Sequence, residues 1–238
     1  QRIFELIFDR NRIYSGYGET TGEREVTAAL TINVTSGAIR NNIISAEDNP
    51  DVHTNDAGNP VNPTQFVGID VTRRGDIEVP ADTVDVYHNT VYSTSSYTGL
   101  VRGIEVDSTA TNVRVKNNSV SFPNQSINDS AVNDISTIAD VSNNVYNDAM
   151  GFSDPDNVMW LSKDYSLSVG SPSLDAGTTV PVFTDFNGSV RDTGTPNAGA
   201  LESAGNVTTD TLNATNVSSA SEITAPSLTL VHSIAAED

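Results

Sequence analysis

Residues 115–120, VKNNSV, contain the six-residue pattern that decides the fold: an apolar residue, two variable residues, an asparagine, one variable residue and a second apolar residue. The pattern recurs at residues 8–13 (FDRNRI), 39–44 (IRNNII), 86–91 (VYHNTV) and 141–146 (VSNNVY). Its asparagines are Asn11, Asn42, Asn89, Asn118 and Asn144. Their separations of 31, 47, 29 and 26 residues predict successive coils of an irregular solenoid, with one long insertion at residues 46–63.

A second strand pattern lies between these copies. Isoleucine and valine alternate with polar residues in Ile32-Asn33-Val34, Ile69-Asp70-Val71 and Ile104-Glu105-Val106. This alternation is typical of a half-buried strand, so each coil carries at least two short strands. One coil cannot bury its own apolar side chains, whereas coils stacked about 4.8 Å apart form parallel strands around a continuous interior. At a sharp turn the stacked asparagines tolerate a left-handed backbone, and their amides are expected to form a hydrogen-bonded ladder.

The composition excludes two classes of partner. The net charge is −19, and Lys116 and Lys163 are the only lysines. Such a chain repels nucleic acid and anionic membranes, and it has no apolar run long enough to span a bilayer. An Asp-rich surface offers oxygen ligands to hard cations, so we expect an extracellular setting in which Ca²⁺ binding is possible but no cofactor is required. The absence of cysteine excludes disulfides and thiolate sites.

Over residues 3–150 the repeat resembles the pectin-lyase-like right-handed β-helix superfamily, whose coils carry a similar Asn before an apolar pair and a similar Gly-Ile-x-Val strand. The resemblance implies an all-β fold, a right-handed parallel β-helix (solenoid) with a small C-terminal β or irregular extension. The coils are expected to occupy residues 1–150.

Three ordered motifs follow, GSPSLDAG (170–177), DFNGSVR (185–191) and AGALE (198–202). They are similar to the segment that ends many bacterial surface β-helix proteins, so residues 151–202 are expected to close the solenoid. Asp175, Asp185, Arg191 and Glu202 are interpreted as a polar knot that covers the strand edges at its open end. Residues 203–238 form a Ser/Thr/Asn-rich tract that resembles the shafts of virion fibres and is expected to be a fibre-like stalk or a linker.

Stacking of the repeats predicts which side chains are neighbours. One outward column is Ala38, Asp85, Arg114 and Asp140, and the next is Arg40, Tyr87, Lys116 and Ser142. The first is most simply an exposed ionic ladder. Together, Arg40, Tyr87, Arg114 and Lys116 make a basic and aromatic strip that could hold an acidic polysaccharide. His88 falls in a column of asparagines, where a structural role beside the ladder is expected.

The second strand pattern supplies a catalytic hypothesis. Asn33, Asp70 and Glu105 are expected to stack outward, with Asp107 two residues beyond Glu105. Asp70 and Glu105 would lie one strand spacing apart, near the roughly 5 Å of retaining glycosidases, while Asp70 and Asp107 approach the longer inverting distance. A metal hypothesis concerns Asp48, Asp51 and Asp56 in the long insertion, although their spacing matches no calcium signature.

Two functions remain open from the sequence. The leading hypothesis is a non-enzymatic structural or adhesive domain of a virion appendage (tail spike or fibre) or of a microbial surface protein. It would contact a polysaccharide or cell-surface glycan and associate with further copies, with a trimer possible. The alternative is a depolymerase, a lyase or glycoside hydrolase, acting on an acidic polysaccharide. The same solenoid serves both kinds of protein, so fold does not decide between them.

Overall fold

The computed structural model describes residues 6–15, 26–46, 65–72, 81–94, 100–123, 132–134 and 139–202. The chain divides into two compact units, Gln1–Asn206 and Val207–Asp238, and every described residue belongs to the first. The expected fibre-like tail, residues 203–238, therefore lies outside the described residues. Within them the only helix is the 3-10 turn η1 (Trp160–Ser162), and no helix is long and apolar enough to cross a membrane.

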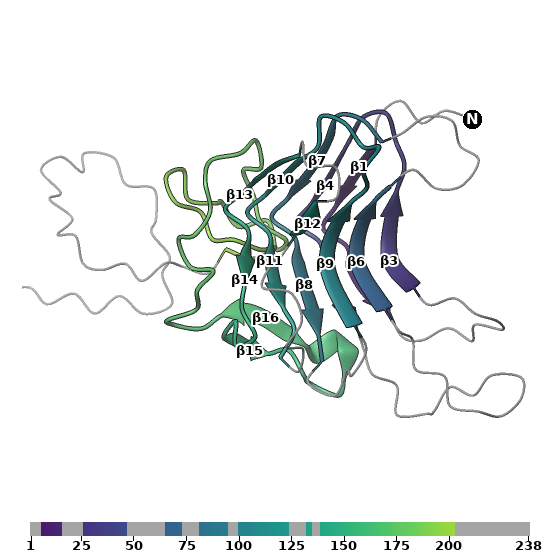
Figure 1. The fold of residues 1–238 in the computed structure, drawn as a ribbon. Coiled ribbons are helices and arrows are strands. Elements are labelled where there is room, and N and C mark those ends of the chain that lie inside the picture. Colours follow the sequence, from purple (N-terminus) through teal and green to yellow (C-terminus); the bar gives the residue numbers. More distant parts are fainter. Residues whose placement is uncertain are drawn as a thin grey trace, which may run out of the picture. The chain divides into compact units, whose positions relative to one another are not determined.

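Three parallel sheets form the body of this unit (Figure 1). Sheet A has the strand order β1 (Leu6–Asp9), β4 (Gly37–Arg40), β7 (Val84–Tyr87), β10 (Arg114–Lys116) and β13 (Asp140–Ser142). Sheet B has β2 (Arg12–Ser15), β5 (Ile43–Ala46), β8 (Thr90–Ser93), β11 (Ser119–Ser121) and β14 (Val145–Tyr146). Sheet C has β3 (Val26–Ile32), β6 (Gln65–Val71), β9 (Leu100–Val106) and β12 (Val132–Asp134). The chain passes through sheets A, B and C in turn, and we call three such successive strands a triplet.

The predicted all-β chain of stacked parallel strands is thus confirmed. Each asparagine motif begins in sheet A and ends in sheet B. The inward side chains of successive triplets form apolar columns, and the following members are completely buried: Ile39, Val86, Val115, Ile44, Val91, Val120, Ile69 and Ile104. Full burial of such a side chain is worth about 1.5–3 kcal/mol relative to exposure. Because β-branched residues pack well on a pleated surface, valine and isoleucine dominate these columns.

The predicted asparagine ladder runs along the corner between sheets A and B. In each step, Oδ1 of one asparagine accepts hydrogen bonds from the backbone N–H and the side-chain amide of the asparagine one triplet earlier. The donor–acceptor distances are 2.8–3.0 Å from Asn11 to Asn42, Asn42 to Asn89, Asn89 to Asn118 and Asn118 to Asn144. Stacked amides therefore connect all five copies of the motif, and we call this chain of bonds the Asn ladder.

The left-handed backbone was predicted at the ladder asparagine itself. It occurs instead at the residue before it. These residues are Arg10, Asn41, His88, Asn117 and Asn143, with φ between 53° and 59°. We call them the corner column. The left-handed residue turns the chain from sheet A to sheet B, and the ladder amide is then free to bond along the stack. Asn89, for example, also donates to the carbonyl oxygens of Ile39 and Tyr87.

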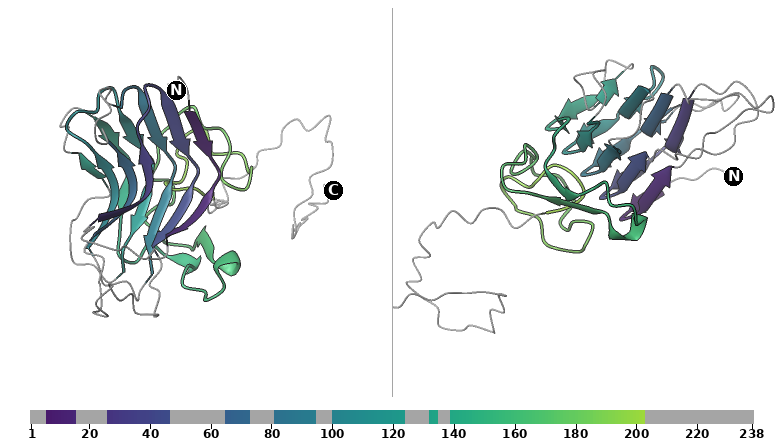
Figure 2. Two further views of the ribbon diagram at one scale, coloured as in Figure 1. Left: turned by 90° about the vertical axis from the view of Figure 1, so that its right-hand side faces the viewer. Right: turned by 90° about the horizontal axis from the view of Figure 1, so that it is seen from below.

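Residues 151–202 form a second layer on the outer face of sheet B, beside the stacked strands (Figure 2). Their antiparallel hairpin consists of β15 (Phe152–Asp154) and β16 (Asp164–Leu167). A second apolar cluster joins this layer to the sheet and contains Ile43, Tyr92, Tyr165, Ala200 and Leu201. The rings of Tyr92 and Tyr165 meet edge to face at 5.8 Å, and every residue of the inner strands β5, β8 and β11 is buried, so sheet B is covered on both faces there.

The position of this layer corrects the expectation that residues 151–202 cover the open end of the stack. The layer contacts the corner column along its length: Asn143 donates to Ala176 O, Asn117 to Thr178 O and Asn41 to Thr184 O, at 3.2, 2.6 and 3.0 Å. In the last triplet the inward-facing Val141 remains 41% exposed. The layer therefore ties the triplets together from the side.

Candidate functional site

Asp70 and Glu105 lie opposite each other on neighbouring parallel strands, as their repeat predicted. Asp70 of β6 pairs with Glu105 of β9, which pairs on its other side with Asn133 of β12. The partner of Asp70 in β3 is Thr31, whereas the sequence pattern predicted Asn33. The apolar alternation continues on both sides of Asn33, so registers that differ by two residues bury the same kind of side chain and the sequence does not separate them.

A glycine two residues before each carboxylate sets its direction. Phe66 and Ile69 both pack in the core although strict alternation would place them on opposite faces, so the phase changes at Gly68. A Cβ added to Gly68 would lie 2.5 Å from Val91 Cγ1 and 2.6 Å from the carbonyl oxygen of Gly103. Only glycine fits there, and the phase change leaves the next polar residue, Asp70, on the outer face.

The carboxylates of Glu105 and Asp107 both accept hydrogen bonds from neighbouring side chains, and Glu105 also forms an ion pair. Glu105 forms an ion pair with Arg102, and its Oε2 accepts a 3.2 Å hydrogen bond from Asn133 Nδ2. Asp107 Oδ1 accepts bonds from the backbone N–H and the hydroxyl of Thr109, at 2.8 and 2.7 Å. Glu105 is therefore placed as an acceptor beside a cation, which suits a nucleophile or an electrostatic role better than a proton donor. Asp107 stabilises the turn after β9.

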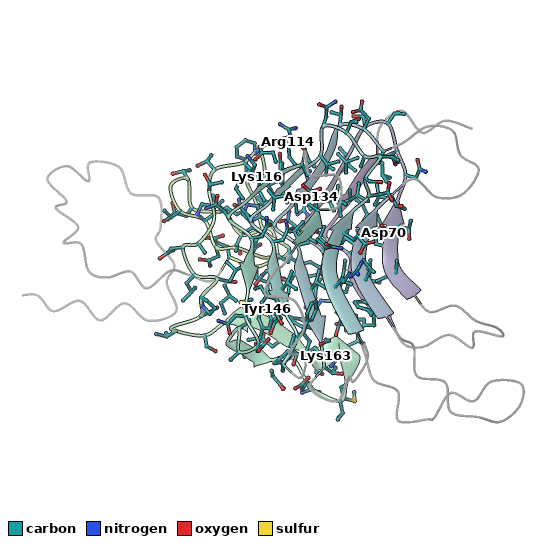
Figure 3. All side chains as sticks on the ribbon, in the orientation of Figure 1. Asp70, Arg114, Lys116, Asp134, Tyr146 and Lys163 are labelled. Carbon is teal, nitrogen blue, oxygen red and sulfur yellow. The ribbon has the colours of Figure 1, made fainter. Side chains whose placement is uncertain are left out.

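The cations predicted to contact glycans lie on the outer face of sheet A. Strand register confirms both predicted columns, Ala38, Asp85, Arg114 and Asp140, and Arg40, Tyr87, Lys116 and Ser142. We call the side chains of Arg40, Tyr87, Arg114 and Lys116 the sheet A strip. Figure 3 shows Arg114 and Lys116 close together on this sheet, apart from Asp70 on sheet C.

Each cation of the strip faces a carboxylate. Arg114 donates from Nε and Nη2 to the two oxygens of Asp85 at 2.5 and 2.6 Å. Lys116 Nζ lies 2.6 Å from Asp140 Oδ2, and Arg40 Nη2 lies 3.3 Å from Asp9 Oδ2. Ion pairs are therefore present on this face, but Asp140 pairs with Lys116 of the neighbouring column and not with Arg114 as predicted. Pairs as exposed as these contribute at most about 1 kcal/mol each.

Tyr87 is the aromatic member of the strip, but its ring is not an open platform. The residue is only 3% exposed, and its hydroxyl donates to Asp85 Oδ1 at 3.1 Å. The guanidinium of Arg114 lies over the ring, 5.9 Å from its centre. Burial, with a smaller contribution from the charge of Asp85, raises the pKa of Tyr87 above its ordinary value. A ligand on this face would therefore meet Arg114 and its ion pair, with the tyrosine beneath.

The candidate metal ligands Asp48, Asp51 and Asp56 lie outside the described residues. Within the described part of the chain, no group of three or more His, Asp or Glu side chains is placed to hold a metal ion. The calcium hypothesis therefore remains a prediction about the long insertion.

His88 of the corner column lies in a buried polar site that residues of the second layer complete. The sequence did not predict where this layer packs. His88 is fully buried; its Nδ1 lies 3.1 Å from Asn197 O, and its Nε2 lies 3.0 Å from Asn117 Nδ2. The first contact requires a proton on Nδ1 and the second requires a bare Nε2, so the imidazole is neutral. Burial, and secondarily the charge of Arg191, lowers the pKa of His88 to about 2. The structural role expected for His88 is confirmed by these contacts.

Arg191 joins the second layer to the same corner. Its Nη1 donates to Glu202 Oε2 at 2.9 Å, and its Nη2 donates to Asn41 Oδ1 at 2.8 Å. Asp185 completes this group by accepting the backbone N–H groups of Ser189 and Glu202 at 2.7 and 2.9 Å. Burial raises the pKa of Glu202, opposed chiefly by the N–H of Asn197 and by Arg191. Arg191, Glu202 and Asp185 thus form a polar knot along the side of the stack. Asp175, the fourth residue predicted for this knot, is exposed, and its backbone N–H donates to Asn197 Oδ1 at 2.9 Å.

No family model, no curated protein and no solved structure matches this chain. Function is therefore argued from the geometry of the described residues.

Proposed function

We propose that the described unit is a right-handed parallel β-helix that acts as a rigid, non-enzymatic structural and adhesive domain. It would be displayed outside the cell, on a virion appendage or a microbial surface, and would contact glycans there. The observation that carries the proposal is the continuous Asn ladder, in which side-chain amides connect five successive copies of the motif. A stack bonded through both its strands and its corner resists bending between triplets, which is what a spacer needs.

The glycan surface of this proposal is the sheet A strip. Arg114 and Asp140 are about half exposed, at 48% and 55% of their side chains. Because each cation already has a carboxylate partner, the strip has little net charge with which to attract an acidic sugar. Paired Arg and Asp side chains nonetheless present donors and acceptors side by side, which matches the neighbouring hydroxyls of a sugar ring. We therefore favour a neutral glycan.

The second candidate function is depolymerisation of an acidic polysaccharide. It is favoured by one observation, that Asp70 and Glu105 are register partners on adjacent strands. Their side chains start from backbones about 5 Å apart, a spacing compatible with the roughly 5 Å between the carboxyl groups of retaining glycosidases. Arg102 beside Glu105 would supply a cation for a uronate. In this reading Asp107 holds the adjacent turn.

A panel of neutral and acidic polysaccharides tests both functions in one experiment. Binding is measured on immobilised glycans, and cleavage is followed by new reducing ends and by the absorbance of unsaturated uronates. The structural proposal predicts binding without cleavage, lost in Arg114→Ala and retained in Glu105→Gln, which sits on the other sheet. Cleavage that disappears in Glu105→Gln but persists in Arg114→Ala would establish the enzyme. The absence of any bound glycan would contradict the adhesive part of the proposal.

A further inference from the structure

The Asn ladder has a direction, and its two ends carry complementary groups. In each step the donors belong to the earlier triplet and the acceptor, Oδ1, belongs to the later one. Asn11 donates to Asn42, and within the described residues its own Oδ1 accepts no hydrogen bond. Asn144 accepts from Asn118, while its backbone N–H has no acceptor within those residues. One end of the ladder therefore offers an acceptor and the other a donor.

Apolar surface is open at the same two ends. The inward column of sheet A runs through Phe8, Ile39, Val86, Val115 and Val141. Its three middle members are fully buried, whereas Phe8 is only partly buried and Val141 is 41% exposed. Sheet B behaves alike, with the partly buried Ile13 and Tyr146 at its ends. Such edges are templates on which a further parallel strand can pair.

We propose that two copies of this chain stack head to tail, with β13 and β14 of one copy pairing in parallel with β1 and β2 of the next. The register of the triplets then continues unchanged: Asn144 N–H donates to Asn11 Oδ1, Val141 meets Phe8 and Tyr146 meets Ile13. Because this contact joins two different surfaces, it does not close on itself and repeats into rods. The inference goes beyond the proposed function and does not require any glycan contact.

The continued register places one charged side chain of the last edge opposite an exposed apolar side chain of the first. The chain as a whole carries −19, which opposes most contacts between copies. The first edge carries Arg10, which is 45% exposed and lies 3.5 Å from Asp9 on the same edge, and the last carries Asp140. In the continued register Asp140 lies opposite Ile7, an outward side chain that is 56% exposed. Position 7 therefore tests the proposed contact with little effect on the fold.

Sedimentation velocity of the full chain over a wide concentration range tests the proposal. We expect species heavier than the monomer whose share rises with concentration. Opposite charges across a strand pair attract and like charges repel, so Ile7→Lys should tighten the association and Ile7→Asp should weaken it, each by up to about fivefold. Val141→Lys places a charge in the apolar column and should abolish the association. Unchanged urea unfolding midpoints would show that these variants fold.

Two further measurements make the assignment specific. Val158, on the β15–β16 hairpin, is 99% exposed, and Val158→Ser should leave the association unchanged. Val141→Lys chains keep a normal first edge, so when mixed with wild type they should add to one end of a rod and shorten it. A wild type that stays monomeric, an association indifferent to the charge at position 7, or one lost in Val158→Ser would each overturn the head-to-tail contact. None of these results bears on glycan binding.

Discussion

Acidification should destabilise this protein through His88. In the folded chain the imidazole is neutral and fully buried, with a pKa of about 2, whereas an unfolded histidine titrates near pH 6.5. Below about pH 6.5 the unfolded chain therefore binds a proton that the folded chain does not. The free energy of unfolding should fall by about 1.4 kcal/mol for each pH unit, or about 2 kcal/mol between pH 6.5 and pH 5. This stability is fully present above pH 6.5 and is lost progressively as the pH falls toward 2.

The chain provides a matched control for this effect. Asn41, Asn117 and Asn143 occupy the equivalent position in other triplets with the same left-handed backbone, so His88→Asn keeps the local conformation. Its loss of the bond to Asn197 costs stability equally at every pH. Urea unfolding of both proteins at about pH 7 and pH 5 isolates the titration, because their carboxylates are the same. The gap between wild type and His88→Asn should narrow by about 2 kcal/mol on acidification. A gap that does not change with pH would refute the reasoning.

Two further pairs of substitutions test the ladder and the second layer by urea unfolding. Asn89→Ala removes a buried amide that both donates and accepts within the ladder, and it should lower the free energy of unfolding by about 3 kcal/mol. Asn144→Ala, at the last rung, should lower it by less. Equal losses of stability would contradict the role given to the ladder. Gly199 has φ of +95°, and an added Cβ would lie 2.8 Å from Ser119 Cβ, so Gly199→Ala should lower the free energy of unfolding by more than about 2 kcal/mol. Gly170 has φ of +86° but open space around it, so Gly170→Ala should lower it by only about 1 kcal/mol. Similar losses of stability in the two variants would show that the packing against sheet B is looser than described.

Repetition explains which parts of the site could be predicted. Because each asparagine motif has the same length from sheet A to sheet B, aligning the copies is equivalent to aligning the strands. The sequence alone therefore predicts that Arg114 lies beside Asp85 and Asp140, and the strand register confirms this. The register does not decide which of the neighbouring side chains form ion pairs. Lys116 pairs with Asp140, and Arg114 donates its hydrogen bonds to Asp85.

The second layer could not be located from the sequence, although a signal of it was present. Ile43 and Tyr92 point outward from sheet B, yet both are large and largely apolar. Outward positions of a strand that faces solvent are usually polar. Motif IRNNII, with apolar residues at both 43 and 44, thus already indicates a sheet buried on both faces. The segment that covers it comes from much later in the chain, and only tertiary contacts such as Ala200 N–H to Thr90 Oγ1 show where it packs.

These contacts also limit what the polar residues of this chain can do. Asn117, His88 and Arg191 have the residue types of a catalytic site, but each is buried and bonded to the backbone or side chains of the second layer. A ligand would have to displace that layer to reach them, and displacing it exposes the apolar cluster around Tyr165 as well. Among the described strands, the polar side chains that a solvent-borne polysaccharide could reach without displacing this layer therefore include those on the outer faces of sheets A and C. Arg114 lies on the outer face of sheet A and Glu105 on that of sheet C. Substituting each in turn therefore distinguishes glycan binding at sheet A from cleavage at sheet C.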